Sequence, residues 1–239
     1  CYFAVSNNDE IDYFSYLPNY INKTEQSVEF LDNEINFFSN SKELEMGMKV
    51  MLHKNLPCEF RQFAIKNMTS SPKSISLLCY IEPILMKLED FNAHPAFAKL
   101  FLKIEFDLDN QIILISRKDR SSDKHVFCGI GFTQSEAFLH NFSREEVINS
   151  SLNSTSLFNN CKTIECNSNY IPDPCVFLKK EIELLPKEQK CCTLFICSAL
   201  SKDEIYQSIA KIRQEKVITS EILPSPIMPS SIEGRLAFS

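Results

Sequence analysis

The chain has 239 residues, of which 44% are hydrophobic, enough apolar material to bury a sizeable core within one large domain. Its net charge of −6 argues against a nucleic-acid-binding surface, because such a surface needs clustered lysines and arginines. It lacks the run of about 18 apolar residues that a transmembrane helix requires. We expect no signal peptide, and because the chain starts at Cys1 we expect it to be cut from a longer protein.

The first 20 residues are unusually rich in aromatic side chains. They are Tyr2, Phe3, Tyr13, Phe14, Tyr16 and Tyr20. Such rings could stack on the apolar faces of a sugar while keeping a polar edge in water. They could equally seal the edge of a β-sandwich, which is the commoner use of aromatic residues.

Strand-like alternation begins near residue 28. Residues 28–40 are typical of two short strands around an Asp32-Asn33 turn. Residues 45–53 alternate cleanly, which predicts an inward face of Met46, Met48, Val50 and Leu52.

The next strand, residues 60–66, changes phase between Phe60 and Phe63. A β-bulge between the two would restore both rings to the core. We expect residues 67–73 to form a hairpin-like turn before a strand at residues 75–81.

The connection at residues 83–101 contains the apolar and aromatic run Phe91-Asn92-Ala93-His94-Pro95-Ala96-Phe97-Ala98-Lys99-Leu100-Phe101. Proline moves the residue before it out of the helical region. After an irregular or briefly helical crossover at residues 83–92, the chain is therefore expected to enter the next strand at His94-Pro95. The strand that follows, residues 101–108, should bury Leu102, Ile104, Phe106 and Leu108 on one face.

Further strands are predicted at residues 111–117, 126–132, 176–184 and 192–199, with a charged loop at residues 117–124 and a Ser/Asn-rich loop at residues 153–169. In the strand at 126–132, Gly129 and Gly131 share one face, where another part of the chain can approach closely.

Two capping boxes predict short helices, because in each a serine is followed three residues later by glutamate. The first is Ser143 with Glu146. The second is Ser201 with Glu204, followed by a stripe of Ile205, Ile209 and Ile212. The predicted fold is therefore an all-β, large antiparallel sandwich over residues 1–216 with one or two short helices. The proline-containing residues 217–239 are expected to be a linker.

Ten cysteines fit either an oxidised secreted scaffold or an intracellular protein that uses cysteine as a small apolar residue. Cys79 and Cys128 lie on core faces of predicted strands, and the adjacent Cys191 and Cys192 point to opposite faces. We therefore expect reduced, buried thiols in a cytoplasmic protein, with no metal site.

Chemistry-bearing motifs are scarce. There is no phosphate-binding glycine loop, nucleophile elbow or metal-binding helix motif. The four histidines, His53, His94, His125 and His140, are dispersed and more typical of structural or surface positions. Glu82, Glu89 and Asp90 are candidate general acids, but sequence alone gives no carboxylate geometry by which to judge them.

The run His94-Pro95-Ala96-Phe97-Ala98-Lys99-Leu100-Phe101, followed by a strand containing Glu105, resembles a motif in the β-sandwich domain of cellobiose-phosphorylase-like enzymes, glycoside hydrolase family 94. The branch most similar to it includes β-1,2-oligoglucan phosphorylase and the phosphorylase-like part of cyclic β-1,2-glucan synthases. Supporting stretches are 14–18, 58–67 and Asp173-Pro174. The family usually has Trp at position 14, whereas this chain has Phe14 and no Trp.

The resemblance implies a supersandwich (galactose-mutarotase-like) domain without catalytic residues. In that family the catalytic Asp belongs to a separate (α/α)₆ barrel C-terminal to the sandwich, and inorganic phosphate is the co-substrate; no other cofactor is expected. Implied partners are that barrel, a β-glucan oligosaccharide and a second copy of the chain in a homodimer. No nucleic-acid or membrane partner is expected.

Four residues are candidates for a domain contact or the rim of a sugar site: His94, Phe97, Lys99 and Arg117. Alternatively, Phe97 and Leu100 simply plug the sandwich. At the level of function, the alternatives to a phosphorylase domain are a free-standing carbohydrate-binding module and a structural or dimerisation domain without ligand.

Overall fold

A computed structural model describes residues 1–7, 10–14, 25–118, 125–149, 171 and 173–215 of the chain. In this part, antiparallel strands form two sheets, one of five strands and one of eight, with three short α-helices. The predicted all-β sandwich is therefore confirmed, with one helix more than expected. The expected loop at 153–169 and linker at 217–239, and most of the charged loop at 117–124, lie outside the described residues.

The smaller sheet has the strand order β11-β12-β7-β1-β2. Its strands, in chain order, are β1 (Tyr2–Asn7), β2 (Glu10–Tyr13), β7 (Lys73–Ile81), β11 (Leu139–Ser143) and β12 (Pro174–Leu184). The larger sheet has the order β3-β4-β5-β6-β13-β10-β9-β8. Its strands are β3 (Glu25–Phe30), β4 (Glu34–Asn40), β5 (Leu44–Leu52), β6 (Cys58–Asn67), β8 (Leu102–Asp107), β9 (Ile112–Lys118), β10 (His125–Phe132) and β13 (Gln189–Ala199).

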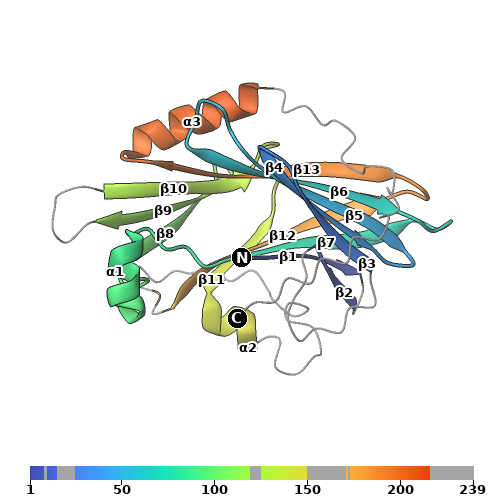
Figure 1. Ribbon diagram of the computed structural model, residues 1–239, viewed down its shortest axis with the longest axis horizontal. Helices are drawn as coiled ribbons and strands as arrows, with labels where there is room; N and C mark the ends of the chain where they lie inside the picture. Colours follow the sequence, from blue (N-terminus) through green and yellow to red (C-terminus); the bar gives the residue numbers. More distant parts are fainter. Residues whose placement is uncertain (8–9, 15–24, 119–124, 150–170, 172, 216–239) are drawn as a thin grey trace.

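The helices add layers outside the sandwich. Helix α3 (Lys202–Gln214) lies on the outer face of the larger sheet, and α2 (Arg144–Asn149) lies on the far side of the smaller sheet, as Figure 1 shows. Apolar clusters fill the space between the sheets, the space under α2 around Val147, and the space under α3 around Ile205 and Ile209. Apolar burial of this kind is the main force that holds such layers together.

Strand β6 shows why its sequence changes phase. Phe60 packs in the cluster under α3, whereas Phe63 packs between the sheets. The register of β6 against β5 and β13 is continuous from residue 59 to residue 66, so the predicted β-bulge is wrong. Since Cys58 and Phe60 join the cluster under α3 while Phe63 and Ile65 lie between the sheets, β6 buries apolar side chains on both faces and its sequence need not alternate.

Residues 67–73 are not a hairpin turn. They carry the chain from β6 in the larger sheet to β7 in the smaller one. The buried side chain of Asn67 organises this corner, because its Nδ2 donates to Ser71 O at 2.7 Å and to Leu185 O at 3.1 Å. A hairpin would have paired β6 with β7. Here the two strands belong to different sheets, and the hydrogen bonds of Asn67 hold the connection between them.

Two predicted inward residues face water. Leu52 is 74% exposed at the end of β5, and Leu108, just after the end of β8, is 70% exposed. Met46 and Met48 are buried as predicted. The turn between β3 and β4 at residues 31–33 also agrees with the sequence.

The serine N-cap of both predicted boxes is confirmed, but Glu204 accepts from the Leu200 N–H and not from that of Ser201, and the Ser143 N–H donates to Asn141 Oδ1. Ser143 Oγ accepts from the Glu146 N–H at 3.3 Å, and Ser201 Oγ accepts from the Glu204 N–H at 3.3 Å. Gly129 lies directly under α3, where a Cβ atom would be 3.0 Å from Ile205 Cγ2. The predicted close approach is thus the approach of this helix.

The aromatic residues near the start of the chain support packing rather than a sugar platform. Phe3 and Phe14 are buried between the sheets, and Tyr13 is buried on the α2 side. Tyr2 is partly exposed, whereas Tyr16 and Tyr20 lie outside the described residues. The cysteines in the described ranges are free thiols, with Cys79 and Cys128 buried as expected.

Candidate functional site

The connection between β7 and β8 crosses from one sheet to the other. It contains helix α1 (Leu88–Ala93) and a single 3-10 turn (Pro95–Phe97), seen at the end of the sandwich in Figure 1. His94 separates the two with φ −142° and ψ 64°, outside the helical region as its following proline requires. The strand starts at Leu102, later than the predicted entry at His94.

Four charged side chains hold this connection against the smaller sheet. Lys99 Nζ lies 2.7 Å from Glu82 Oε2 and 2.8 Å from Asp173 Oδ1. Arg144 binds the same two carboxylates, with Nε 3.2 Å from Glu82 Oε1 and Nη1 3.3 Å from Asp173 Oδ2. We call these four residues the charge ring.

The fold brings the ring together because its members lie at neighbouring strand ends. Glu82 follows β7 and Asp173 precedes β12, and these two strands pair with Ile81 opposite Val176. Arg144 begins α2 directly after β11, and its N–H donates to Asp173 O at 3.1 Å. Only Lys99 comes from the connection itself.

The ring strongly favours the ionised form of Glu82. Partial burial alone would raise the pKa of this carboxyl group, but hydrogen bonds from Lys99, Tyr80 and Arg144 lower the pKa to about 2. The pKa of Lys99 is raised: burial opposes the charge, and the hydrogen bonds to Asp173 and Glu82 outweigh it. A general acid needs a pKa near the working pH, so Glu82 is unsuited to that role.

Arg117 holds the other side of the connection from β9 in the larger sheet. Its Nη1 donates to Ala98 O at 2.5 Å and approaches Met86 Sδ at 3.5 Å. The guanidinium also lies over the ring of Phe101, 5.8 Å from its centroid. Lys99 and Arg117 therefore fasten the connection to both sheets.

His94 and Phe97 instead face water, with their ring centroids 6.1 Å apart. Phe97 is 51% exposed, so it does not plug the sandwich; Leu100 is at the margin of exposure. Several other large apolar side chains of the connection are also exposed. With Phe97 they are Ile84, Leu88, Leu100 and Phe101, and we call this set the apolar surface.

The structure thus brings the four predicted residues together at the connection between β7 and β8 but separates their roles. Lys99 and Arg117 hold the segment, whereas His94 and Phe97 are presented by it. Arg144 was not predicted as a member, and Glu82 was predicted only as a candidate acid. No spacing signal could have linked residues 82, 144 and 173, because strand pairing alone brings them together.

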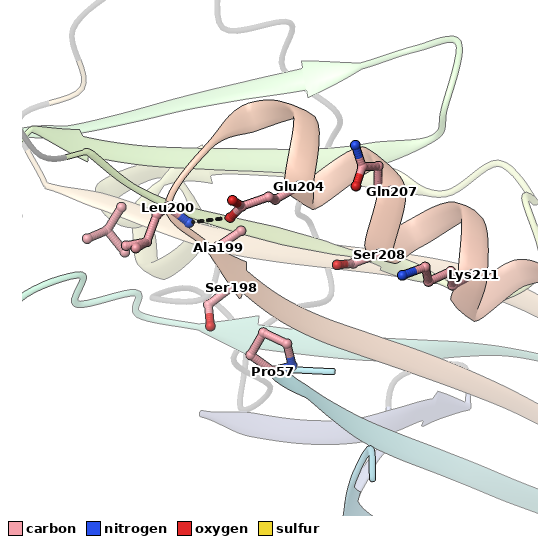
Figure 2. A pocket seen from close by; sticks show the side chains of 9 residues that line it. Pro57, Ser198, Ala199, Leu200, Glu204, Gln207, Ser208 and Lys211 are labelled. Carbon is pink, nitrogen blue, oxygen red and sulfur yellow. Dashed lines mark hydrogen bonds between the residues drawn. The ribbon is translucent and has the colours of Figure 1, made fainter. Parts of the chain in front are cut away.

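A groove separate from this connection lies beside α3, the helix on the outer face of the larger sheet (Figure 2). Its volume is about 450 Å³, and it is lined by Pro57, Val126, the end of β13 and the first turns of α3. The side chains of Glu204, Gln207 and Lys211 line it from the helix, and Glu204 Oε2 accepts from the Leu200 N–H at 3.1 Å. Carboxylates placed to act as an acid–base pair are absent from this lining.

Within the described ranges, no three His, Cys, Asp or Glu side chains gather where they could hold a metal ion. Of the helices in the same ranges, none is both long enough and apolar enough to span a membrane.

The chain matches the family model "Glycosyl hydrolase 94, supersandwich domain" over residues 1–215. It is 21% identical over 212 residues to the cyclic β-(1,2)-glucan synthase NdvB of Rhizobium meliloti (strain 1021), an alignment that covers 81% of this chain and 7% of that protein.

Two solved structures share the fold. A putative kojibiose phosphorylase from the human microbiome superposes with a TM-score of 0.52 at 10% identity, covering 90% of this chain and 25% of that one. A bacterial glucoamylase complexed with acarbose gives a TM-score of 0.56 at 10% identity, covering 90% of this chain and 28% of that one. The chain therefore spans only a small part of each relative.

Proposed function

The chain belongs to the glycosyl hydrolase 94 supersandwich family, and from that premise we propose that it is the non-catalytic sandwich domain of a longer glycoside phosphorylase. The parent enzyme would cleave β-linked gluco-oligosaccharides with inorganic phosphate and release α-glucose 1-phosphate. The observation that carries the proposal is the family match over residues 1–215. The preference for β-1,2 linkages rests on the likeness to a cyclic β-(1,2)-glucan synthase.

The absence of suitable acids from the candidate site supports a non-catalytic role. Glu82 is held ionised within the charge ring, and Glu89 and Asp90 lie exposed on α1. Glycoside cleavage needs a proton donor at the leaving oxygen, in most families a carboxylic acid with a raised pKa. In our proposal this donor lies on an (α/α)₆ barrel elsewhere in the parent protein.

The apolar surface is the part of the domain suited to meeting that barrel. Exposed apolar side chains that gather in one segment are typical of contact sites, whereas scattered ones are normal on any surface. The charge ring and Arg117 hold the segment in place before contact, which lowers the entropic cost of association. We therefore assign His94 and Phe97 to the contact and Lys99 and Arg117 to its support.

The first test is activity. The isolated chain, incubated with β-1,2-linked gluco-oligosaccharides and inorganic phosphate, should release no α-glucose 1-phosphate, whereas the full reading frame should release it. Release by the isolated chain would contradict the non-catalytic assignment. Binding of the isolated chain to gluco-oligosaccharides on a glycan array, with no activity of the full protein, would instead identify a carbohydrate-binding module.

The second test concerns the contact. In the full-length protein, Phe97→Ser combined with Leu88→Ser should weaken association of the sandwich with the rest of the protein, seen as at least tenfold faster proteolytic separation. The matched control is Leu108→Ser with Leu185→Ser, which replaces two apolar residues of comparable exposure outside the connection. Equal rates for the two double variants would contradict the assigned surface.

A further inference from the structure

Cys58 and Cys197 face each other across neighbouring strands under α3. They are register partners in the antiparallel pair of β6 and β13. Both are free thiols, 4% and 1% exposed respectively, and both belong to the apolar cluster under the helix. The other register-paired cysteines of the described strands are opposite different residue types: Cys79 faces Phe3 and Leu178, Cys128 faces Ser198, Cys191 faces Ala64 and Cys192 faces Phe63.

The hydrogen bonds around the pair define its geometry. The Ser198 N–H donates to Pro57 O at 2.9 Å, one residue beyond the pair, and Cys58 O accepts from the His53 N–H at 2.8 Å on the opposite side of β6. The Cys58 N–H donates to Leu56 O, again not to Cys197. Cys58 and Cys197 are therefore a non-hydrogen-bonded pair, a class in which the Cα atoms lie about 4.5 Å apart. The Cys197 thiol itself donates to Gly129 O at 3.5 Å, on the β10 side, so it must rotate about χ1 to meet Cys58. A disulfide needs Cα atoms about 4.4–6.8 Å apart.

The groove beside α3 is lined by one sequence neighbour of each cysteine. Pro57, directly before Cys58, and Ser198, directly after Cys197, both line it (Figure 2). A small reagent in the groove would thus lie next to both strand ends. Burial raises the pKa of the Cys58 thiol well above its usual value and that of Cys197 to about 11, so the exchange should be slow.

We propose that Cys58 and Cys197 form a redox-active pair that a low-molecular-weight disulfide, such as oxidised glutathione, converts into a cross-strand disulfide. The thiolate of Cys58, the more exposed of the two, attacks one sulfur of the reagent, breaks its S–S bond and releases one thiol. The Cys197 thiolate then attacks the Cys58 sulfur and releases the second thiol. The two protein thiols lose two protons and two electrons, and the reagent is reduced to two thiols.

The bond would join residues 58 and 197 and so close a long loop of the chain, which stabilises the native state mainly by restricting the unfolded one. It would also fix the ends of β6 and β13, where the groove is lined by Pro57 and Ser198. Oxidation is therefore expected to raise the melting temperature by roughly 5–10 °C, and reduction with dithiothreitol should reverse the rise.

The test is peptide mapping of the native chain after incubation with oxidised glutathione. We expect a peptide that links Cys58 to Cys197, with its appearance matching the rise in melting temperature. Cys58→Ser and Cys197→Ser should each abolish the rise, whereas the control Cys128→Ser, a buried thiol opposite a serine, should behave like the wild type.

The peptide map of the wild type is decisive even if a serine variant folds poorly. A native chain in which the 58–197 link fails to form overturns the proposal, and so does one in which other cysteines are linked in its place. A melting temperature that rises equally in Cys58→Ser also overturns it.

Discussion

Under α3, the larger sheet is held by apolar side chains that are shielded from water on both faces, whereas the connection at residues 83–101 is held by charged groups at its margins. Phe195 is fully buried in the first region, and Phe97 is half exposed in the second. The first region gains its stability from apolar burial; the second uses ion pairs and hydrogen bonds, which leave its own apolar side chains free for another surface. The contrast separates the part that makes the fold from the part assigned to contact.

The largest difference between the regions should appear on truncating the two phenylalanines. Phe195→Ala is expected to lower the free energy of unfolding by about 3–5 kcal/mol, because it removes a buried ring and leaves a cavity. Phe97→Ala should cost less than about 1 kcal/mol, because half of that ring is already in water. Urea denaturation of both variants measures this, and similar costs would remove the distinction between the regions.

The next largest change in the free energy of unfolding is expected on substituting Gly129, which lies under α3. Intrinsic strand propensity favours valine over glycine, so an exposed strand would gain stability from Gly129→Val. Here we expect a loss of about 2 kcal/mol, because even a Cβ atom would lie 3.0 Å from Ile205 Cγ2 and 3.2 Å from Cys197 Sγ. A rise in the urea midpoint would show that α3 packs less closely than described, and Gly129→Ala should give a smaller loss.

The smallest effect concerns the charge ring and depends on pH. The folded-state pKa of Glu82 is about 2, below its ordinary value of 4.5, so its contribution is fully present above pH 4.5 and is lost as the pH falls towards 2. With solvent screening, Glu82→Gln should cost about 1 kcal/mol at pH 7.

Measured by urea denaturation across this range, the difference between Glu82→Gln and the wild type should shrink as the pH falls from 5 to 2. The control is Glu89→Gln on the exposed helix α1, whose small effect should not follow that course. A difference for Glu82→Gln that stays constant with pH would show that the ring does not stabilise the fold through its charge.

Local patterns were read correctly wherever neighbouring residues decide the structure. Ser143 and Ser201 cap helices because each reaches an N–H three residues ahead. Gly129 was correctly assigned to a close approach, because only a missing side chain permits one. The alternation at Met46 and Met48 gave the right buried face.

Errors arose where distant elements decide the environment. The phase change between Phe60 and Phe63 looked like a bulge because nothing local reveals that a helix 140 or more residues away covers the outer face of β6. Leu52 and Leu108 fit an apolar pattern but are exposed at the ends of their strands. In both cases, the burial of a side chain depends on whether an element distant in the sequence packs on it.

The sequence alone predicts most of the strands, the two capped helices and the likeness to a phosphorylase sandwich. It can do so because alternation, helix caps and motifs each depend on residues that are close together in the chain. Only the tertiary structure decided which sheet each strand joined, and that Glu82, Lys99, Arg144 and Asp173 meet in one ring. The reason is physical: ion pairs need atoms within a few ångströms, and strand pairing brings together residues that are far apart along the chain.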